Sequence, residues 1–567
     1  MRLGSIVSPR QTEEKHKVSD PLSITEVLTV GDLLVRATKR SPNKTAIKFP
    51  DGKLSFQELH EAAMARAKEL YALGVRPSDH VGIFLPSCLQ YLEYHFGIAY
   101  LGAVSVPMNA RYRAHELFYQ VRNADLVHIV TTTHVADGLN FMERLQDAFP
   151  ALRDSPTQAP VSLADAPVLR TVSLLTNEEC PGAISRNLLA EKGSKVSAEQ
   201  ITALRRAVTL RQTALMLYTS GTTSEPKGCT ISHEALVRTG MALAERYKMT
   251  DQDVFWSPLP MFHVGALFPL CAAYHAGASY VGMQFFDAGL ALRQIRENAV
   301  TIGYPSFALF LSDLVYHPDF RAEDMATLRL LNCSLALQPE SFREKMRDAF
   351  PNAVMVGTFG MTETAGTVTT SDLSDPESER FNRLGRPFDG LSVRIEREDG
   401  TEADIGEHGE ICVKGFSIFT DYYGDREKTA YAKRGGWFHT GDIGSVDEAG
   451  TLMFHGRVKD MLKVGGENVA AIEIELVVAQ HPAVKLCQVV GKPDTRLQEV
   501  PVAFVELAPG ATVDPAEIID YCKSRIASFK VPRDVHFISE WPTSASKIQK
   551  FRLQQRVIEA LEQKQAH

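Results

Sequence analysis

Short apolar runs alternate with longer segments of helical spacing along the first part of the chain. The runs occupy residues 81–85, 103–107 and 126–130, and the helical segments between them are 89–101 and 115–123. Buried strands that alternate with helices form βαβ units, which assemble into a parallel sheet covered on both faces. The pattern therefore predicts an α/β fold.

The alternation resumes after residue 228 and changes near residue 385. Strands are expected at 299–303, 328–332 and 353–357, with helices between them. From about 385, short segments rich in glycine and aspartate, at 392–395, 409–413 and 451–454, predict an antiparallel β subdomain. Beyond about 459, strands at 486–490 and 502–507 and a helix at 515–526 predict a small α+β domain. Several domains agree with a length of 567 residues, which is too long for one core.

Three stretches depart from this alternation. Residues 133–208 are rich in turn residues, and we interpret them as a surface excursion that is partly mobile. Residues 264–283 are the longest apolar segment, but Pro269, His275 and three glycines interrupt it. A buried helix that ends at Gly277, followed by a strand, is therefore favoured over a membrane span. Residues 1–30 are polar, without the apolar core of a signal peptide, and indicate an N-terminal extension.

Composition excludes some classes of function. The net charge is −8 and there is no basic block, which argues against a nucleic-acid-binding surface. The eight cysteines are scattered without a CxxC pair, so neither a zinc site nor a disulfide framework is indicated. Reduced thiols and the absence of a leader favour a cytoplasmic protein.

A polar loop at residues 218–228 offers the first chemistry. Its sequence, Tyr-Thr-Ser-Gly-Thr-Thr-Ser-Glu-Pro-Lys-Gly, follows an apolar strand and precedes a helix for which Ser232 is the expected N-cap. Small residues, hydroxyls and one lysine between a strand and a helix suit a polyphosphate. A Walker A loop is excluded, since Pro226-Lys227-Gly228 stands where that motif needs Gly-Lys followed by serine or threonine. An ordinary polar turn remains the alternative.

The loop resembles the signature of the adenylate-forming superfamily, which includes acyl-CoA and aryl-CoA synthetases, luciferases and the adenylation domains of peptide synthetases. It differs from the usual pattern at Ser224, where a glycine is expected. Further segments resemble family motifs in the family's order, so that the resemblance spans nearly the whole chain: 258–265 (PLPMFHVG), 357–363 (GTFGMTE), 437–444 (WFHTGDIG), 456–460 (GRVKD), 463–468 (KVGGEN) and 544–550 (SASKIQK).

The resemblance implies a particular domain organisation. After the extension, residues 31–458 would form a large domain of mixed, mainly parallel sheets, which includes the β subdomain at about 385–456. Residues 459–567 would form a small mobile α+β lid domain with its hinge at Lys459.

The resemblance also assigns roles to residues. ATP and AMP would contact Thr219, Ser220, Gly221, Thr222, Thr223, Lys227, Ser334, Leu335, Ala336, Gly357, Thr358, Phe359, Gly360, Met361, Thr362, Asp442, Arg457, Lys463 and Lys547. Magnesium would bind Glu363 and Thr222, and coenzyme A would pass Gly465 and Gly466. The acyl group would lie against Phe262, His263, Val264, Tyr304, Ala365 and Gly366. The catalytic set would be Lys547, Thr362, Glu363 and His263, the last lining or gating the acyl site without transferring a proton.

These residue types suit the reaction. Joining a carboxylate to the α-phosphate of ATP brings two anions together, which requires a metal, fixed cations and placed donors. A glutamate oxygen suits Mg²⁺, and an aspartate can accept bonds from two ribose hydroxyls. The small residues Gly303, Ala365 and Gly366 suggest room for a sizeable or branched acid.

The implied function is an acid–thiol ligase that uses ATP, Mg²⁺ and coenzyme A. Its substrate would be a fatty, alicyclic or steroid-side-chain acid, and its partners would be small molecules, with neither nucleic acid nor a transmembrane segment; a homodimer is left open. The alternatives are a ligase that loads a carrier protein or another acceptor, a luciferase-like oxidative enzyme, and a nucleotide-binding regulator without catalysis.

Overall fold

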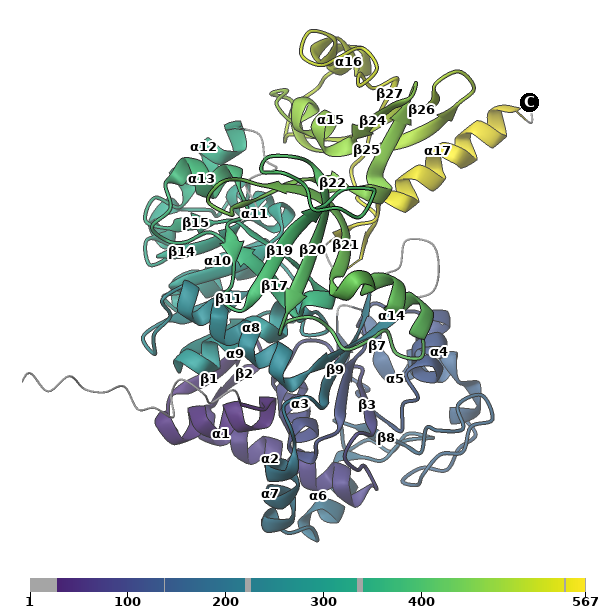
Figure 1. Ribbon diagram of the computed structural model, residues 1–567. Coiled ribbons are helices and arrows are strands. Elements are labelled where there is room, and N and C mark those ends of the chain that lie inside the picture. The colour runs from purple at the N-terminus through teal and green to yellow at the C-terminus, as the bar shows by residue number, and fades with distance from the viewer. Residues whose placement is uncertain (1–27, 137, 220–225, 334–339, 545–546, 566–567) are drawn as a thin grey trace, which may run out of the picture.

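The computed structural model describes residues 28–136, 138–219, 226–333, 340–544 and 547–565. Figure 1 shows a large body, built from the first part of the chain, with a smaller domain from its C-terminal part at one end. The body contains mainly parallel sheets and the small domain mixes a sheet with helices, so the expected fold class is confirmed.

Within the described ranges, the largest sheet has seven strands in the order β15-β14-β13-β11-β12-β1-β2. Its neighbours pair in parallel except β1 and β2, which form a hairpin at one edge. The strands are β1 (Thr45–Phe49), β2 (Gly52–Ser55), β11 (Val254–Ser257), β12 (Ser279–Gly282), β13 (Ile302–Ser306), β14 (Leu330–Cys333) and β15 (Val354–Val356). The helices of this region are α8 (His233–Arg246), α9 (Val264–Ala276), α10 (Ala288–Glu297), α11 (Ala308–Val315), α12 (Glu340–Ala349) and α13 (Glu377–Asn382).

The second sheet has six described strands in the order β10-β9-β4-β3-β5-β8, parallel except for the β9–β10 pair. The strands are β3 (His80–Ile83), β4 (Val104–Pro107), β5 (His128–Thr131), β8 (Thr171–Leu174), β9 (Thr213–Thr219) and β10 (Lys227–Ser232). The helices are α1 (Val30–Arg40), α2 (Phe56–Ala72), α3 (Leu89–Leu101), α4 (Ala114–Asn123), α5 (Phe141–Ala148), α6 (Arg186–Ser194) and α7 (Ala198–Ala207); β6 (Val135–Ala136) and β7 (Leu139–Asn140) form a short ribbon.

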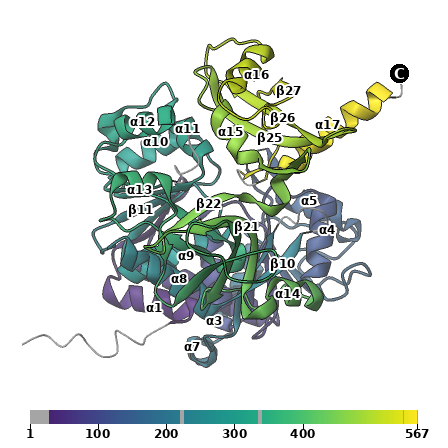
Figure 2. The same cartoon turned by 45° about the horizontal axis from the view of Figure 1, so that its top comes forward.

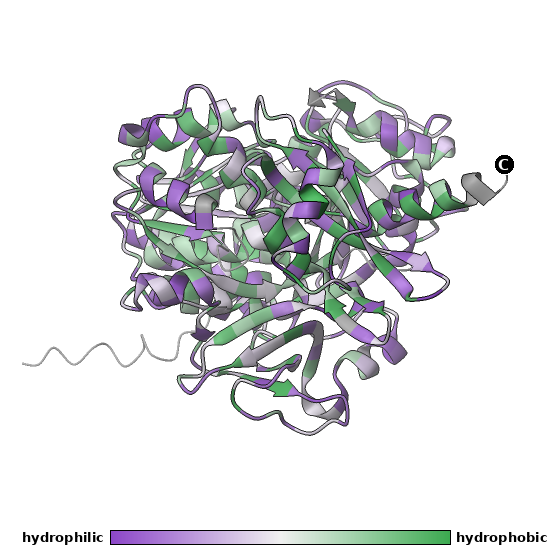
Figure 3. Ribbon diagram, turned by 90° about the horizontal axis from the view of Figure 1, so that it is seen from above, coloured by the Kyte–Doolittle hydropathy of each residue, from purple (hydrophilic) through white to green (hydrophobic). Residues whose placement is uncertain are grey.

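Two helices are apolar on nearly every side because they are buried. α3 contacts β3 and β4 of one sheet and β1 and β2 of the other. α9 ends at Gly277, which adopts the left-handed conformation (φ 78°), and β12 follows directly. The expected buried helix and strand at 264–283 are thus confirmed, and no helix in the described part of the chain is long and apolar enough to cross a membrane. Figure 3 shows apolar residues along the inner strands and polar ones on the outward helices.

The interpretation of residues 133–208 as a surface excursion is wrong. β8 pairs with β5 in the second sheet, and each residue of β8 is buried. Leu163, Leu169 and Leu174 join the same apolar cluster as Phe141 of α5. Turn residues in this stretch separate short elements that pack tightly, so their frequency was a poor guide to burial.

Two antiparallel sheets connect the body to the C-terminal domain. The first contains β16 (Thr358–Met361), β17 (Gly366–Thr370) and β18 (Arg386–Pro387). The second, which is the expected β subdomain, contains β19 (Leu391–Glu396), β20 (Gly409–Gly415), β21 (Phe438–Val446) and β22 (Leu452–Arg457), with α14 (Arg426–Ala432) before β21.

The C-terminal domain is a sheet in the order β24-β23-β26-β25, with β27 beside β26. It contains β23 (Met461–Val464), β24 (Glu467–Ala470), β25 (Val484–Asp494), β26 (Gln498–Leu507), β27 (Asp534–Phe537), β28 (Thr543–Ser544), β29 (Lys547–Ile548), α15 (Ala471–Val478), α16 (Pro515–Lys523) and α17 (Lys550–Gln565). Figures 1 and 2 place it at the same end of the body as α11 and β22. Lys485 of β25 lies 3.4 Å from the carboxylate of Asp313 in α11, which joins the domain to the body.

Candidate active site

The described ends of the signature stretch lie in two antiparallel strands, β9 and β10. Thr219 ends β9, Lys227 begins β10, and the two residues pair across the antiparallel ladder. The expected passage from strand to helix is therefore corrected: β10 comes first, and Ser232 then caps α8 by accepting a hydrogen bond from the Ala235 N–H. Several residues of the prediction lie outside the described residues: Ser220, Gly221, Thr222, Thr223 and Ser224.

Glu363 lies in a single helical turn, Thr362–Thr364, between β16 and β17. The Thr364 hydroxyl closes this turn, since Oγ1 accepts from the Met361 N–H at 3.0 Å and donates to the Gly366 carbonyl at 2.7 Å. Ala365 completes the reversal in the left-handed region, at φ 51°. The turn leaves the predicted phosphate and metal residues, Thr362 and Glu363, half-buried at its outer side.

Tyr422 connects the signature hairpin to Glu363. Its hydroxyl donates a 3.0 Å hydrogen bond to Glu363 Oε1, and Lys227 Nζ lies 5.1 Å from the centre of its ring. Burial, followed by the negative charge of Glu363, raises the pKa of the Tyr422 phenol, so it remains a donor. A cation, an aromatic ring and a carboxylate from three separate segments thus form one group.

The two residues expected at the ribose lie together. Asp442 of β21 and Arg457 of β22 are cross-strand partners, and Arg457 Nε is 3.1 Å from Asp442 Oδ1. The region also connects with Glu363: the Glu363 carbonyl accepts from the Phe419 N–H at 2.8 Å, and the Phe419 ring lies 5.4 Å from that of Phe438, which begins β21.

The residues expected around adenine follow β15. The Gly357 carbonyl accepts a bond from the Thr370 hydroxyl, and Thr358 Oγ1 accepts one from the Asn332 amide at 3.3 Å. Phe359 is only 6% exposed, whereas Gly360 is exposed and Met361 half-buried. Ser334, Leu335 and Ala336, expected on the other side of adenine, lie outside the described residues.

The expected acyl-site residues come from neighbouring elements. Phe262 and His263 precede α9 with their rings 5.0 Å apart, Val264 begins that helix, and the Tyr304 hydroxyl is 3.1 Å from Thr367 Oγ1 in β17. Ala365 is fully buried beside Gly366.

The small residues do not leave the open space that the sequence suggested. A Cβ atom on Gly366 would overlap the ring of Phe268, and one on Gly303 would lie 2.8 Å from Leu331 Cδ1. Large neighbouring side chains fill the space beside these glycines, so the glycines do not indicate the size of the substrate.

Four of the predicted residues of the C-terminal domain lie in or just before its first hairpin, and the fifth, Lys547, lies in a separate strand pair. Lys459 is exposed in the short turn Val458–Asp460 that joins the domain to β22, and Lys463 is exposed on β23. Gly465 (φ 63°) and Gly466 (φ 92°) form the two-residue turn between β23 and β24, a conformation that glycine adopts without strain. Lys547 begins β29, where its backbone pairs with Ser544.

Two residues of this site escaped sequence reasoning, namely Tyr422 and Glu410. Glu410 Oε1 accepts a hydrogen bond from the Gly441 N–H, next to Asp442. Each lies within a stretch that pattern analysis describes only as strand or loop. The available signals were an acidic residue at the start of a strand and a Tyr-Tyr pair between Asp421 and Gly424.

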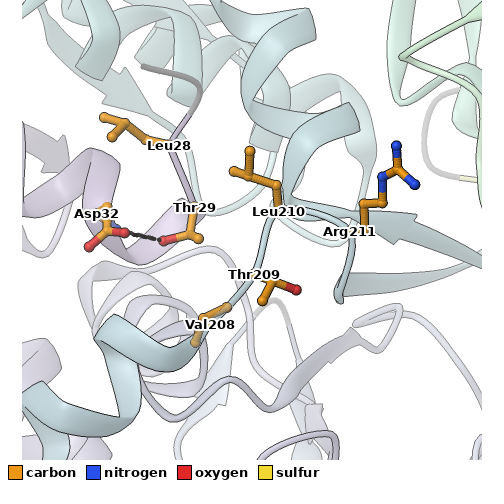
Figure 4. A pocket seen from close by; sticks show the side chains of 7 residues that line it. All are labelled: Leu28, Thr29, Asp32, Val208, Thr209, Leu210 and Arg211. Atoms are coloured by element: carbon orange, nitrogen blue, oxygen red, sulfur yellow. Dashed lines mark hydrogen bonds between the residues drawn. The ribbon is translucent and has the colours of Figure 1, made fainter. Parts of the chain in front are cut away.

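A shallow depression elsewhere, of about 550 Å³, has no such chemistry (Figure 4). It lies between the start of α1 and residues 208–211, and its carboxylate, Asp32, is bound by Thr29 and Arg205. None of the predicted site residues lines it.

Mixed parallel sheets, a β subdomain and a small α+β domain, with these motifs on the strands and turns between them, define the fold of an adenylate-forming enzyme. Two family models match: that of the AMP-binding enzyme at residues 34–423 and that of the AMP-binding enzyme C-terminal domain at residues 473–547. The chain belongs to the AMP-binding enzyme family.

Relatives and solved structures cover almost the whole chain. YngI of Bacillus subtilis (strain 168), named as an acyl-CoA synthetase, is 31% identical over 94% of this chain and 97% of its own. A 3-[(3aS,4S,7aS)-7a-methyl-1,5-dioxo-octahydro-1H-inden-4-yl]propanoyl:CoA ligase of Rhodococcus jostii (strain RHA1) is 31% identical over 91% and 96%. The anthranilate CoA ligase AuaEII, solved with anthranoyl-AMP, has a TM-score of 0.80 at 25% identity and covers 94% of this chain and 98% of its own.

Proposed function

We propose that the protein is an AMP-forming acyl-CoA ligase. It would activate a carboxylic acid with ATP to an acyl adenylate and pyrophosphate, and then transfer the acyl group to coenzyme A with release of AMP. The observation that supports this proposal most strongly is the group formed by Lys227, Tyr422 and Glu363, in which a cation and a carboxylate lie on the same tyrosine, one near its ring and one at its hydroxyl.

The residues present fit a magnesium ion. Glu363 offers a half-buried carboxylate, a hard oxygen donor fixed by the Tyr422 hydroxyl. Glu363 would hold the ion together with Thr222. When bound, magnesium lowers the repulsion between the phosphates and the incoming carboxylate.

The remaining residues would align the two anions. Asp442 and Arg457 would bind the ribose, with Thr362 and Lys227 on the phosphates and Lys547 between the acyl carboxylate and the α-phosphate. Rotation of the C-terminal domain about Lys459 would then exchange Lys547 for the Gly465–Gly466 turn, past which coenzyme A would enter.

The names of the relatives support a class of substrate. The methyl-dioxo-octahydro-indenyl propanoyl:CoA ligase and a feruloyl-CoA synthase are about equally similar to this chain, at 31% and 30% identity. We therefore favour a bulky acid, alicyclic or derived from a steroid side chain, with a fatty acid next. Loading of a carrier protein is the competing activity.

A panel of acids assayed with ATP, Mg²⁺ and coenzyme A, scored by AMP release and by mass detection of the thioester, tests the proposal. Thioester from a bulky acid supports it. ATP–pyrophosphate exchange without thioester would favour loading of another acceptor, and no exchange with any acid would favour a nucleotide-binding regulator.

A further inference from the structure

The antiparallel ladder between β20 and β21 is interrupted where Asp442 leaves it. Glu410 pairs with Ile443, and Cys412 pairs with His439. Between these pairs, residues 440–442 of β21 therefore stand opposite a single residue, Ile411. This is a bulge, which turns the side chains of the bulged strand away from their regular alternation.

The carboxylate of Glu410 takes the place of the missing ladder bond. Its Oε1 accepts from the Gly441 N–H at 2.9 Å, and Gly441 has a positive φ of 72°. Its Oε2 accepts from His439 Nδ1 and from an Arg434 guanidinium nitrogen, both at 2.9 Å. One side chain thus binds the strand, the bulge and the turn that precedes β21.

The bulge in turn fixes Asp442. Thr440 Oγ1 donates to the Ile411 carbonyl at 2.7 Å and accepts from the Asp442 N–H at 3.1 Å. Asp442 is 3% exposed and is bound by Arg457 on its other side. The bulge therefore holds the backbone of Asp442, and Arg457 holds its carboxylate.

We infer that Glu410 is a positioning residue for nucleotide binding, acting through the Thr440–Gly441–Asp442 bulge to aim Asp442 at the ribose hydroxyls. The inference rests on the proposed function of Asp442. The printed hydrogen bonds of Glu410 go to Gly441, His439 and Arg434, so it would act on nucleotide binding through Asp442.

The neighbouring side chains favour this structural role over a metal site. Ligand atoms of Glu396, Cys412 and His439 lie within 4.8 Å of one another. However, Arg394 binds the carboxylate of Glu396, and Glu410 binds His439 Nδ1. Burial, followed by the charge of Glu410, raises the pKa of the Cys412 thiol to about 12, so the thiol stays neutral. The charged groups around it are thus paired with protein side chains and need no metal ion.

Binding of ATP and of 2′,3′-dideoxy-ATP, measured by calorimetry on the full chain, tests the inference. Glu410→Ala should raise the Kd for ATP about tenfold and that for the dideoxy nucleotide less than twofold, because only ATP carries the ribose hydroxyls that Asp442 binds. Glu410→Gln keeps an acceptor for the Gly441 N–H and should raise the Kd for ATP about threefold. The exposed Glu402→Ala should change neither.

Two further comparisons make the outcome decisive. In exchange kinetics the KM for ATP should rise in Glu410→Ala while kcat changes less than threefold, and Glu410→Ala added to Asp442→Asn should cost no further ATP affinity. Equal loss of both nucleotides, or no loss of ATP affinity, would overturn the positioning role. If Asp442→Asn itself fails to distinguish the nucleotides, then the ribose contact is wrong and the inference fails with it.

Discussion

The hydroxyl of Tyr422 donates a 3.0 Å hydrogen bond to Glu363 Oε1, although the two residues are 59 positions apart. Two backbone contacts hold the segment that carries Tyr422: the Phe419 N–H donates to the Glu363 carbonyl, and Tyr422 bridges to Cys229 of β10. The expected metal ligand is therefore oriented by a segment that belongs to neither the signature loop nor the Thr-Glu motif.

Tyr422→Phe should raise the Mg²⁺ concentration needed for half-maximal ATP–pyrophosphate exchange about tenfold, since a hydrogen bond to a charged group contributes about 1.5–3 kcal/mol. Tyr423→Phe is the matched control, because its hydroxyl bonds Asp125 instead, at 2.8 Å. An unchanged Mg²⁺ dependence in Tyr422→Phe would show that Glu363 needs no such orientation.

Lys547→Ala should lower adenylation by about 100-fold or more, the order of effect found when one fixed donor to a developing charge is removed. Thioester formation from a supplied acyl adenylate should be spared, because that step follows domain rotation. The exposed Lys523→Ala serves as control in the same domain. Equal loss of both half-reactions would contradict the assignment of Lys547.

Gly366→Ala should destabilise the protein by about 2–4 kcal/mol, through overlap with the Phe268 ring and through its positive φ of 115°. Gly400→Ala, at φ 84° with open space around it, should cost only about 1 kcal/mol. Thermal unfolding measures the difference. Phe268→Leu should partly restore Gly366→Ala, and equal cost at both glycines would argue against the steric account.

Buried histidines should make the fold sensitive to acid. Burial lowers the pKa of His95 to about 4 and those of His128 and His233 to about 3. Below pH 6.5 these histidines therefore bind protons in the unfolded chain but stay neutral in the folded chain. Their contribution to the free energy of unfolding is complete above pH 6.5 and is lost as the pH drops toward 4. Each histidine should cost about 2 kcal/mol at pH 5.

Thermal unfolding of His128→Asn at pH 7.5 and pH 5 checks this expectation. The variant loses the 2.6 Å bond to Thr171 at both pH values. Its free energy of unfolding should nevertheless fall between pH 7.5 and pH 5 by about 2 kcal/mol less than that of the natural chain. The exposed His134→Asn should retain the full difference. An unchanged difference in His128→Asn would exclude this residue as a source of acid sensitivity.

Local patterns were sufficient for much of the architecture. The α3 segment 89–101 was predicted with the observed bounds, because its apolar composition and the Gly102 that follows it are local properties. β10 and β8 were missed: β10 is rich in small and polar residues, and β8 lies among turns, so neither has an alternation that distinguishes a strand from a loop.

The sequence by itself determined the class of fold, the family motifs and their order, because each motif is a contiguous stretch whose residue types are set by the ligand that the family binds. Only the tertiary structure decided which groups stand beside those motifs. Tyr422 meets Glu363, and Glu410 meets the Gly441 N–H, through pairings of strands and segments distant in the chain. Such contacts depend on sheet register and on a bulge, which involve residues far apart and leave no local periodicity to detect.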